Sequence, residues 1–187
     1  SDLGIDHSIF KIIAADNEII AAEMAVAMTR DGHADIVMKG LIGTDKFLKA
    51  VMDREKGLMN PGSVLTYVGA IEISSYHKLL FVTDPAVIPF PDLNQKTEMV
   101  RYAVEMCSRF GIQNPKVALI GASEKPSHHF PSSLDYVKMV ELTRNGKTLD
   151  CIMDGPLDIF LACDKESVEI KGVNTPVNGD ADILVFP

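Results

Sequence analysis

Polar side chains in this sequence stand directly after short apolar runs, at positions where strands are expected to end. Because the carboxyl ends of parallel strands meet at one edge of a sheet, such residues would face a common crevice, where open α/β sheets bind ligands. A lysine there could hold an anion, and hydroxyls and carboxylates could donate hydrogen bonds or hold a proton. The sequence therefore predicts a small-molecule site built from strand ends. Its candidate residues are Lys39, Thr83, Asp84, Ser123 and Asp154.

The last of these candidates lies in the stretch Cys151–Asp158, where an apolar run ends on Asp154 and meets Gly155 and Pro156. Gly permits backbone angles that other residues avoid, and Pro favours a turn or a first helical position, so a turn and a helix are predicted after Asp154. In one interpretation Asp154 lines the crevice, where burial would raise its pKa. In the other it caps the following helix or anchors the turn. The residues alone leave both open.

A second candidate anion site is the loop Lys39-Gly40-Leu41-Ile42-Gly43-Thr44, which joins a predicted strand to a predicted helix. Free N–H groups and the helix dipole converge at such a point and could hold a phosphate together with Lys39, Gly40 and Thr44. The loop is not a P-loop, because its lysine precedes the glycines. The alternative is a tight turn in which Thr44 caps the helix.

Three further polar residues have more limited roles. Thr83 could donate its hydroxyl to a substrate, whereas Asp84 could position a donor or cap a turn. Ser123, in a Gly-Ala-Ser loop, could face the crevice. It is not predicted to be a nucleophile, because no positioned histidine and no G-x-S-x-G motif accompany it. The neighbouring pair His128 and His129 does not predict a metal site, since successive side chains diverge and no third ligand is close in sequence.

The elements that would position these residues alternate between strand and helix, which predicts an α/β protein with a mostly parallel sheet in each half. Three prolines between residues 85 and 91 predict a stiff connection, so we place a domain boundary there, giving domains 1–88 and 89–187. A hairpin is expected from the apolar runs on either side of residues 74–77. Strands are predicted at 10–14, 34–38, 64–73, 78–83, 117–120, 151–154 and 183–186, and helices at about 16–32, 45–52, 93–110, 134–144 and 155–169.

Composition limits the classes of function. The 187 residues are 47% hydrophobic, which is enough to form a core, and carry a net charge of −8. Lysines and arginines are scattered, so neither a nucleic-acid footprint nor a basic membrane patch is expected. No apolar run reaches the roughly 18 residues of a membrane span. Three cysteines without paired spacing, together with the lack of an export signal, predict a cytoplasmic protein.

Several longer segments, taken together, resemble the phosphate acetyl/butyryltransferase family. Their order and spacing cover nearly the whole chain, so the resemblance is specific even though no single motif is. The segments are Asp35–Ile42, Phe81–Asp84, Pro91–Lys96, Gly111–Ala118, Asp154–Leu157 and Thr175–Leu184.

This resemblance implies an acyltransferase that converts an acyl-CoA and phosphate into an acyl phosphate and CoA, reversibly and without a metal or redox cofactor. It implies two α/β/α domains with mostly parallel sheets and a cleft between them, a fold shared with isocitrate/isopropylmalate-type dehydrogenases. It also implies a homodimer. Because that fold serves several chemistries, the fold alone does not identify the reaction.

The chain departs from the family in length, because members extend beyond it at both ends. The Ser-Arg pair and the Asp that the family is thought to use on substrate fall after Pro187, so catalytic residues are expected outside this sequence. A smaller departure is Asn178, where the family more often has Ala. The alternative function is a non-catalytic homologue or fragment that binds a CoA-like or acyl-phosphate ligand. The predicted substrate-binding residues are Lys39, Gly40, Thr44, Thr83, Asp84, Ser123, Asp154, Gly155 and Asn178.

Overall fold

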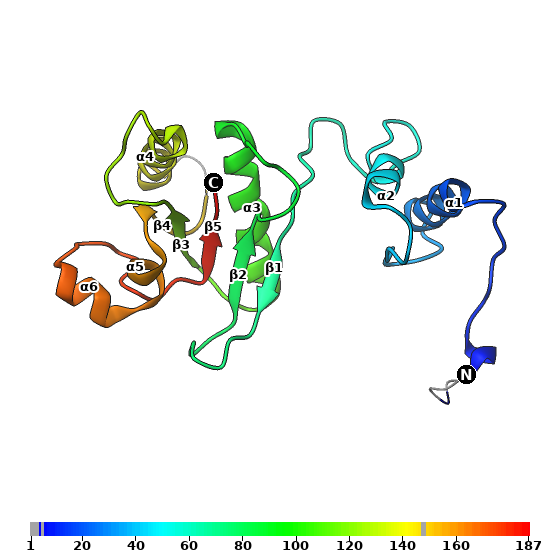
Figure 1. The fold of residues 1–187 in the computed structure, drawn as a ribbon, viewed down its shortest axis with the longest axis horizontal. Coiled ribbons are helices and arrows are strands. Elements are labelled where there is room, and N and C mark those ends of the chain that lie inside the picture. The colour runs from blue at the N-terminus through cyan, green and yellow to red at the C-terminus, as the bar shows by residue number, and fades with distance from the viewer. Residues whose placement is uncertain (1–3, 5, 147–148) are drawn as a thin grey trace. The chain divides into compact units, whose positions relative to one another are not determined.

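The computed structural model describes residues 4, 6–146 and 149–187, and its contacts divide the chain into two compact units (Figure 1). Unit 1 comprises Ser1–Ser63 and unit 2 comprises Val64–Pro187. This division falls earlier than the predicted boundary between residues 88 and 89. The physical reason is strand pairing, because the strand at Leu80–Thr83 hydrogen-bonds to the last strand of the chain and so belongs to the same sheet.

Unit 2 is built on one five-stranded sheet with the order β1-β2-β5-β3-β4. The first two strands form the predicted hairpin and run antiparallel, whereas β2, β5, β3 and β4 are mutually parallel (Figure 1). The predicted α/β class with a mostly parallel sheet is therefore confirmed. The strands are β1 (Gly69–Ile71), β2 (Leu80–Thr83), β3 (Lys116–Ile120), β4 (Ile152–Leu157) and β5 (Ile183–Val185).

Helices cover both faces of this sheet because successive side chains along each strand point to opposite sides. In β3, for example, Leu119 packs in a core cluster with α3 and α4, whereas Ile120 packs in a second cluster with α5 and α6. Unit 2 is thus a three-layer α/β/α sandwich with one apolar core on each face. Its helices are α3 (Leu93–Arg109), α4 (Pro131–Arg144), α5 (Ile159–Cys163) and α6 (Lys165–Lys171).

The start of α3 follows from a capping box. The Asp92 side chain accepts a hydrogen bond from the Gln95 backbone N–H at 2.8 Å, and the Gln95 side chain accepts one from the Asp92 N–H at 2.9 Å. The buried face of the helix then follows the expected helical spacing, with Val100, Ala103 and Cys107 in the core. The predicted helix at 93–110 is confirmed.

Unit 1 contains a short 3-10 helix η1 (His7–Ile9) and the helices α1 (Glu18–Arg30) and α2 (Thr44–Val51). Asn17, and not Asp16, caps α1 by accepting from the N–H groups of Ile19 and Ile20. The strands predicted at 10–14 and 34–38 are wrong, because both segments are irregular. Their apolar side chains lie exposed, and an isolated strand without a sheet partner is not stable. Within the described ranges, none of the helices has the length and apolar composition that a membrane crossing requires.

Candidate functional site at the carboxyl edge of the sheet

The four parallel strands of unit 2 bring their carboxyl ends to one edge of the sheet. The loop after β3 opens at this edge with Gly121, Ala122 and Ser123, and Pro187 follows β5 there. A cavity of about 720 Å³ lies beside these residues. Of the nine residues predicted to bind substrate, only Ser123 lines it. Its other walls come from residues 89–91 before α3, from α3 itself and from the beginning of α4.

An ion pair with a buried lysine forms one side of this cavity. Lys96, which is 2% exposed, donates from Nζ to Asp135 Oδ2 at 2.9 Å, and its ammonium lies 5.8 Å from the centre of the Tyr136 ring. All three residues line the cavity. Sequence reasoning missed Lys96, although a signal existed. It stands three and four residues before Met99 and Val100 on the apolar stripe of α3, where a lysine is unusual.

Thr83 and Asp84 lie at the same edge but are buried away from the cavity. The Asp84 carboxylate accepts four hydrogen bonds, from Thr66 Oγ1 at 2.7 Å and from three backbone N–H groups at 2.8–3.1 Å. Burial alone would raise its pKa, but these hydrogen bonds outweigh burial and hold the pKa of Asp84 below its ordinary value. Asp84 therefore fixes the loop after β2 as a buried anion. Whether Thr83 and Asp84 contact substrate stays a prediction.

A strand end was predicted at Asp154, but β4 continues through Gly155 and Pro156 to Leu157. The next helix, α5, is capped instead by Asp158, which accepts from the Leu161 N–H at 2.9 Å. Asp154 pairs opposite Ala118 in the sheet and accepts from Arg144 at the end of α4 at 3.1 Å. Strand pairing with β3 thus overrides the turn preference of the Gly-Pro pair. A substrate contact of Asp154 or Gly155 stays a prediction.

Asn178 lies outside the carboxyl edge, because it precedes β5. It is exposed and adopts a left-handed conformation, with φ of 52°, in the turn that leads to Gly179. Asn178 therefore has a structural role in this turn, because asparagine tolerates the left-handed conformation better than most residues. Its contact with substrate also stays a prediction.

The remaining predicted residues, Lys39, Gly40 and Thr44, lie in unit 1. The Lys39 ammonium closes its own loop by donating to the backbone oxygens of Gly40 and Ile42 at 3.3 and 2.9 Å. Thr44 is the first residue of α2, and Gly43 occupies the cap position, so the predicted threonine cap is wrong. Lys39 and Gly40 thus lie in the loop that precedes α2, and Thr44 begins that helix. Whether the loop holds an anion is untested.

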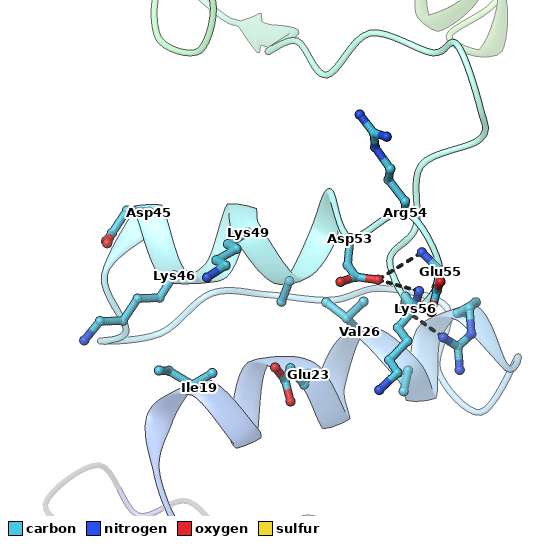
Figure 2. A pocket seen from close by; sticks show the side chains of 13 residues that line it. Ile19, Glu23, Val26, Asp45, Lys46, Lys49, Asp53, Arg54, Glu55 and Lys56 are labelled. Atoms are coloured by element: carbon cyan, nitrogen blue, oxygen red, sulfur yellow. Dashed lines mark hydrogen bonds between the residues drawn. The ribbon is translucent and has the colours of Figure 1, made fainter.

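Unit 1 has a cavity of its own, of about 710 Å³, between α1 and α2 (Figure 2). Its lining alternates cationic and anionic side chains, among them Glu23, Lys46, Lys49 and Asp53. Asp53 accepts from the backbone N–H groups of Glu55 and Lys56 and so shapes the turn after α2 (Figure 2). Lys39, Gly40 and Thr44 do not line this cavity.

Comparison with known proteins finds a match to the family described as "Phosphate acetyl/butaryl transferase" over residues 6–187. The chain is 37% identical over 185 residues to the phosphate butyryltransferase of Clostridium acetobutylicum, covering 99% of this chain and 61% of that protein. It is 32% identical over 167 residues to the phosphate acetyltransferase of Thermotoga maritima, covering 89% of this chain and 56% of that protein. The chain thus spans well under two thirds of the length of these relatives.

Solved structures agree with this match. A branched-chain phosphotransacylase from Enterococcus faecalis superposes with a TM-score of 0.87 at 31% identity, covering 98% of this chain and 65% of the other. A phosphotransacetylase from Streptococcus pyogenes superposes with a TM-score of 0.72 at 23% identity, covering 90% of this chain and 50% of the other, which establishes the shared fold alone.

Proposed function

Because the chain belongs to the phosphate acetyl/butyryl transferase family, we propose that the protein transfers a short acyl group between CoA and inorganic phosphate. The observation that carries this proposal is the family match across residues 6–187, which includes every predicted substrate-binding residue. Both butyryl- and acetyl-transferring relatives are similar to the chain. The higher identity to the butyryl-transferring relative supports butyryl-CoA as the preferred donor.

The proposed reaction is a direct transfer with both substrates bound together. A phosphate oxygen attacks the thioester carbonyl carbon, a C–O bond forms, and the C–S bond breaks. The products are the acyl phosphate and the CoA thiolate, which takes up a proton to become the thiol. Such a step needs donors that orient phosphate, donors that stabilise the carbonyl oxygen as it becomes an oxyanion, and a proton or positive field for the leaving sulfur.

We assign substrate-binding roles, and no catalytic role, to residues of this chain. Lys39 and the N–H groups of its loop would orient a phosphate, and Ser123 would donate a hydrogen bond from the loop after β3. Asp84 would hold the loop that carries it rather than touch the reacting atoms, because its four acceptor bonds are already used.

The oligomeric state, the cellular location and the binding partners are also proposals. The family resemblance supports a homodimer, and cysteines without paired spacing support a cytoplasmic location. In the described part of the chain all three cysteines are free thiols. The partners would then be the two substrates, acyl-CoA and phosphate, with no requirement for nucleic acid or a membrane surface.

A thiol-release assay tests the reaction. The intact protein is mixed with butyryl-CoA and phosphate, and liberated CoA is followed with a thiol reagent, with acetyl-CoA as the second donor and sulfate in place of phosphate as the control. We expect phosphate-dependent release that is faster with butyryl-CoA. Release that is absent, or equal in sulfate, would refute the acyltransferase. Tight acyl-CoA binding without release would favour the alternative, a non-catalytic binding homologue.

A further inference from the structure

The chain contains two asparagines that are followed by glycine, in the pairs Asn145-Gly146 and Asn178-Gly179. The side-chain amide of such an asparagine is chemically labile, because the backbone nitrogen of the next residue can attack its carbonyl carbon. Glycine favours this attack, since it has no side chain to block the nitrogen and permits backbone angles that other residues avoid. Both asparagines are exposed. The sequence alone therefore predicts the same reactivity for the two pairs.

The reaction at such a pair is deamidation through a cyclic imide. Hydroxide removes the proton of the glycine N–H, and the nitrogen forms a bond to the carbonyl carbon of the asparagine side chain. The bond from that carbon to the amide nitrogen breaks, and ammonia leaves with a proton from water. Water then opens the ring at one of its two carbonyl carbons, which gives aspartate or isoaspartate. One water is consumed and one ammonia released, and a neutral amide becomes a carboxylate.

The glycine of the second pair holds its N–H inside the protein. Gly179 is buried, and its N–H donates to the backbone oxygen of Leu161 in α5 at 3.1 Å. A Cβ built on Gly179 would lie 2.4 Å from the carbonyl carbon of Asp164, so the glycine backbone packs directly against the junction of α5 and α6. Hydroxide and the Asn178 side chain reach this nitrogen only after the turn leaves the two helices.

The glycine of the first pair is open to solvent. Asn145 follows the last residue of α4, and Gly146 is exposed with φ of 68°. A Cβ built on Gly146 meets no described atom within 4 Å. The Gly146 N–H donates to the Thr143 oxygen at 2.9 Å, in the last turn of the helix. Because hydrogen bonds at helix ends open more readily than those in a packed interior, hydroxide has access to this nitrogen.

From this difference we propose that Asn145 is a site of spontaneous modification to aspartate and isoaspartate in the folded protein, and that the fold protects Asn178 from the same reaction. The new charge has a neighbour to act on, because Arg144 donates to Asp154 at 3.1 Å and so connects the end of α4 to β4. A carboxylate at position 145 competes for this arginine and stands at the negative end of the helix dipole, where an anion is unfavourable. The modification therefore weakens the end of α4.

Peptide mapping of the intact protein after incubation in warm, mildly alkaline buffer tests the site. Cleavage after glutamate places the two pairs on separate peptides, 142–166 and 170–187, and fragmentation in the mass spectrometer assigns the modified residue. We expect Asn145 to deamidate at least about tenfold faster than Asn178. Asn60 and Asn114 are internal controls, because each precedes a proline, which has no N–H to attack. Equal rates at the two pairs, or a faster reaction at Asn178, would overturn the inference.

The same incubation in guanidinium chloride shows whether the fold causes the difference. In the unfolded chain Gly146 and Gly179 are equally open, so we expect Asn145 and Asn178 to react at similar rates. The rate at Asn178 should therefore rise on unfolding much more than the rate at Asn145. A difference between the two rates that persists in denaturant would overturn the inference, because protection would then come from local sequence and not from packing against α5 and α6.

Variants test the site and its effect on α4 separately. Asn145→Gln should abolish most isoaspartate formation in the folded protein, measured with an enzyme that methylates isoaspartate, because the longer side chain needs a larger ring. Asn178→Gly, which suits the left-handed turn, is the matched control and should leave the isoaspartate yield unchanged. An unchanged yield in Asn145→Gln would overturn the site. Asn145→Asp should lower the urea midpoint relative to freshly purified parent, and an equal or higher midpoint would overturn the effect on α4.

Discussion

Asp84 is a buried carboxylate whose hydrogen bonds hold two segments of unit 2 together. Its carboxylate accepts one hydroxyl and three backbone donors that lie on both sides of β2. Two of these donors belong to Thr66 and Tyr67, which are distant in sequence, so the sequence could show a carboxylate at a strand end but not its partners. Asp84 holds the hairpin and the loop after β2 together.

Replacing Asp84 with Asn tests this role. An amide puts two donors among four existing donors, so we expect a loss of about 3 kcal/mol in the free energy of unfolding at pH 7, measured by urea denaturation. Asp150→Asn, an exposed aspartate of the same unit, is the control. Because the folded pKa of Asp84 is lowered, its contribution is present above the unfolded value and lost as pH falls through the folded value. The difference between the parent and Asp84→Asn should therefore narrow in acid, and a constant difference would contradict the role.

Lys39 is the residue of unit 1 that we propose to contact phosphate or CoA. In the structure its ammonium bonds to backbone oxygens of its own loop, so an incoming phosphate would compete for it. For Lys39→Ala we expect a KM for phosphate or CoA raised about tenfold, since a charge-assisted hydrogen bond contributes roughly 1.5–3 kcal/mol. Steady-state thiol release measures the effect, and Lys11→Ala, an exposed lysine of the same unit, is the control. Unchanged kinetics would remove Lys39 from the site.

Strand β4 depends on a glycine where it pairs with β3. A Cβ built on Gly155 would lie 2.5 Å from Leu119 Cβ and 2.7 Å from Leu119 O, closer than real Cβ atoms approach. The ladder register also shifts between Ala118 and Ile120 at this point. Gly155 thus allows two strands to approach, which explains why a Gly-Pro pair occurs inside a strand.

Gly155→Ala should therefore lower the free energy of unfolding by about 1–3 kcal/mol, as expected when a side chain is forced into a packed site. Gly40→Ala is the matched control, because a Cβ there meets nothing within 4 Å. Chemical denaturation of both variants measures the difference. Equal free energies of unfolding for Gly155→Ala and Gly40→Ala would contradict this prediction, because β3 and β4 would then accommodate a side chain at position 155 without losing stability.

Charged residues join three strands at the opposite, amino edge of the sheet. Asp180, before β5, accepts from Lys116 of β3 at 2.9 Å and lies 3.2 Å from Lys78, before β2. Burial alone would raise the pKa of Asp180, but hydrogen bonds and charge from the two lysines outweigh it and hold the pKa far below its ordinary value. The cluster connects strands that are remote in sequence.

We expect Asp180→Asn to lower the free energy of unfolding by about 1–2 kcal/mol at pH 7, at or slightly above the top of the range for surface pairs, because two lysines converge on one partly buried carboxylate. Since the folded pKa is lowered, this contribution is lost as pH falls below the unfolded value. Thermal unfolding at pH 7 and in acid, with Asp150→Asn as the control, measures the effect. A stability difference between the parent and Asp180→Asn that grows in acid would contradict this prediction.

Sequence patterns identified most elements of unit 2 and both α-helices of unit 1, but they failed at the two strands predicted in unit 1. A strand such as 117–120 or a helix such as 93–110 is encoded by apolar residues that find partners within the chain, and the structure has them at Lys116–Ile120 and Leu93–Arg109. The segments at 10–14 and 34–38 carry the same apolar pattern but pair with no strand in the described chain. The cavity of unit 2 was not predicted, because it is formed by Lys96 together with residues from the range 121–136. These residues are distant in sequence and come together only in the folded protein.

At the scale of the whole molecule, unit 2 holds both apolar cores. Every residue of the two core clusters, and every side chain packed against them, belongs to Val64–Pro187. This unit is therefore expected to fold without unit 1.

A fragment of residues 64–187 should unfold cooperatively in urea, with a midpoint equal to that of the unit 2 transition in the full chain. The control is the same fragment with Leu119→Ala, which opens a cavity in the core and should lower the free energy of unfolding by about 2–5 kcal/mol. A fragment with no cooperative transition would show that unit 1 supplies part of its stability.

The alternation of side chains along β3 has a consequence for anyone who redesigns this chain. The sheet separates the two cores, so Val140 belongs to the cluster on one face and Leu161 to the cluster on the other. Substitutions at well-separated sites that share no partners have additive effects on stability. Each core can accordingly be repacked by itself, in separate libraries, and the best solutions for the two faces combined afterwards.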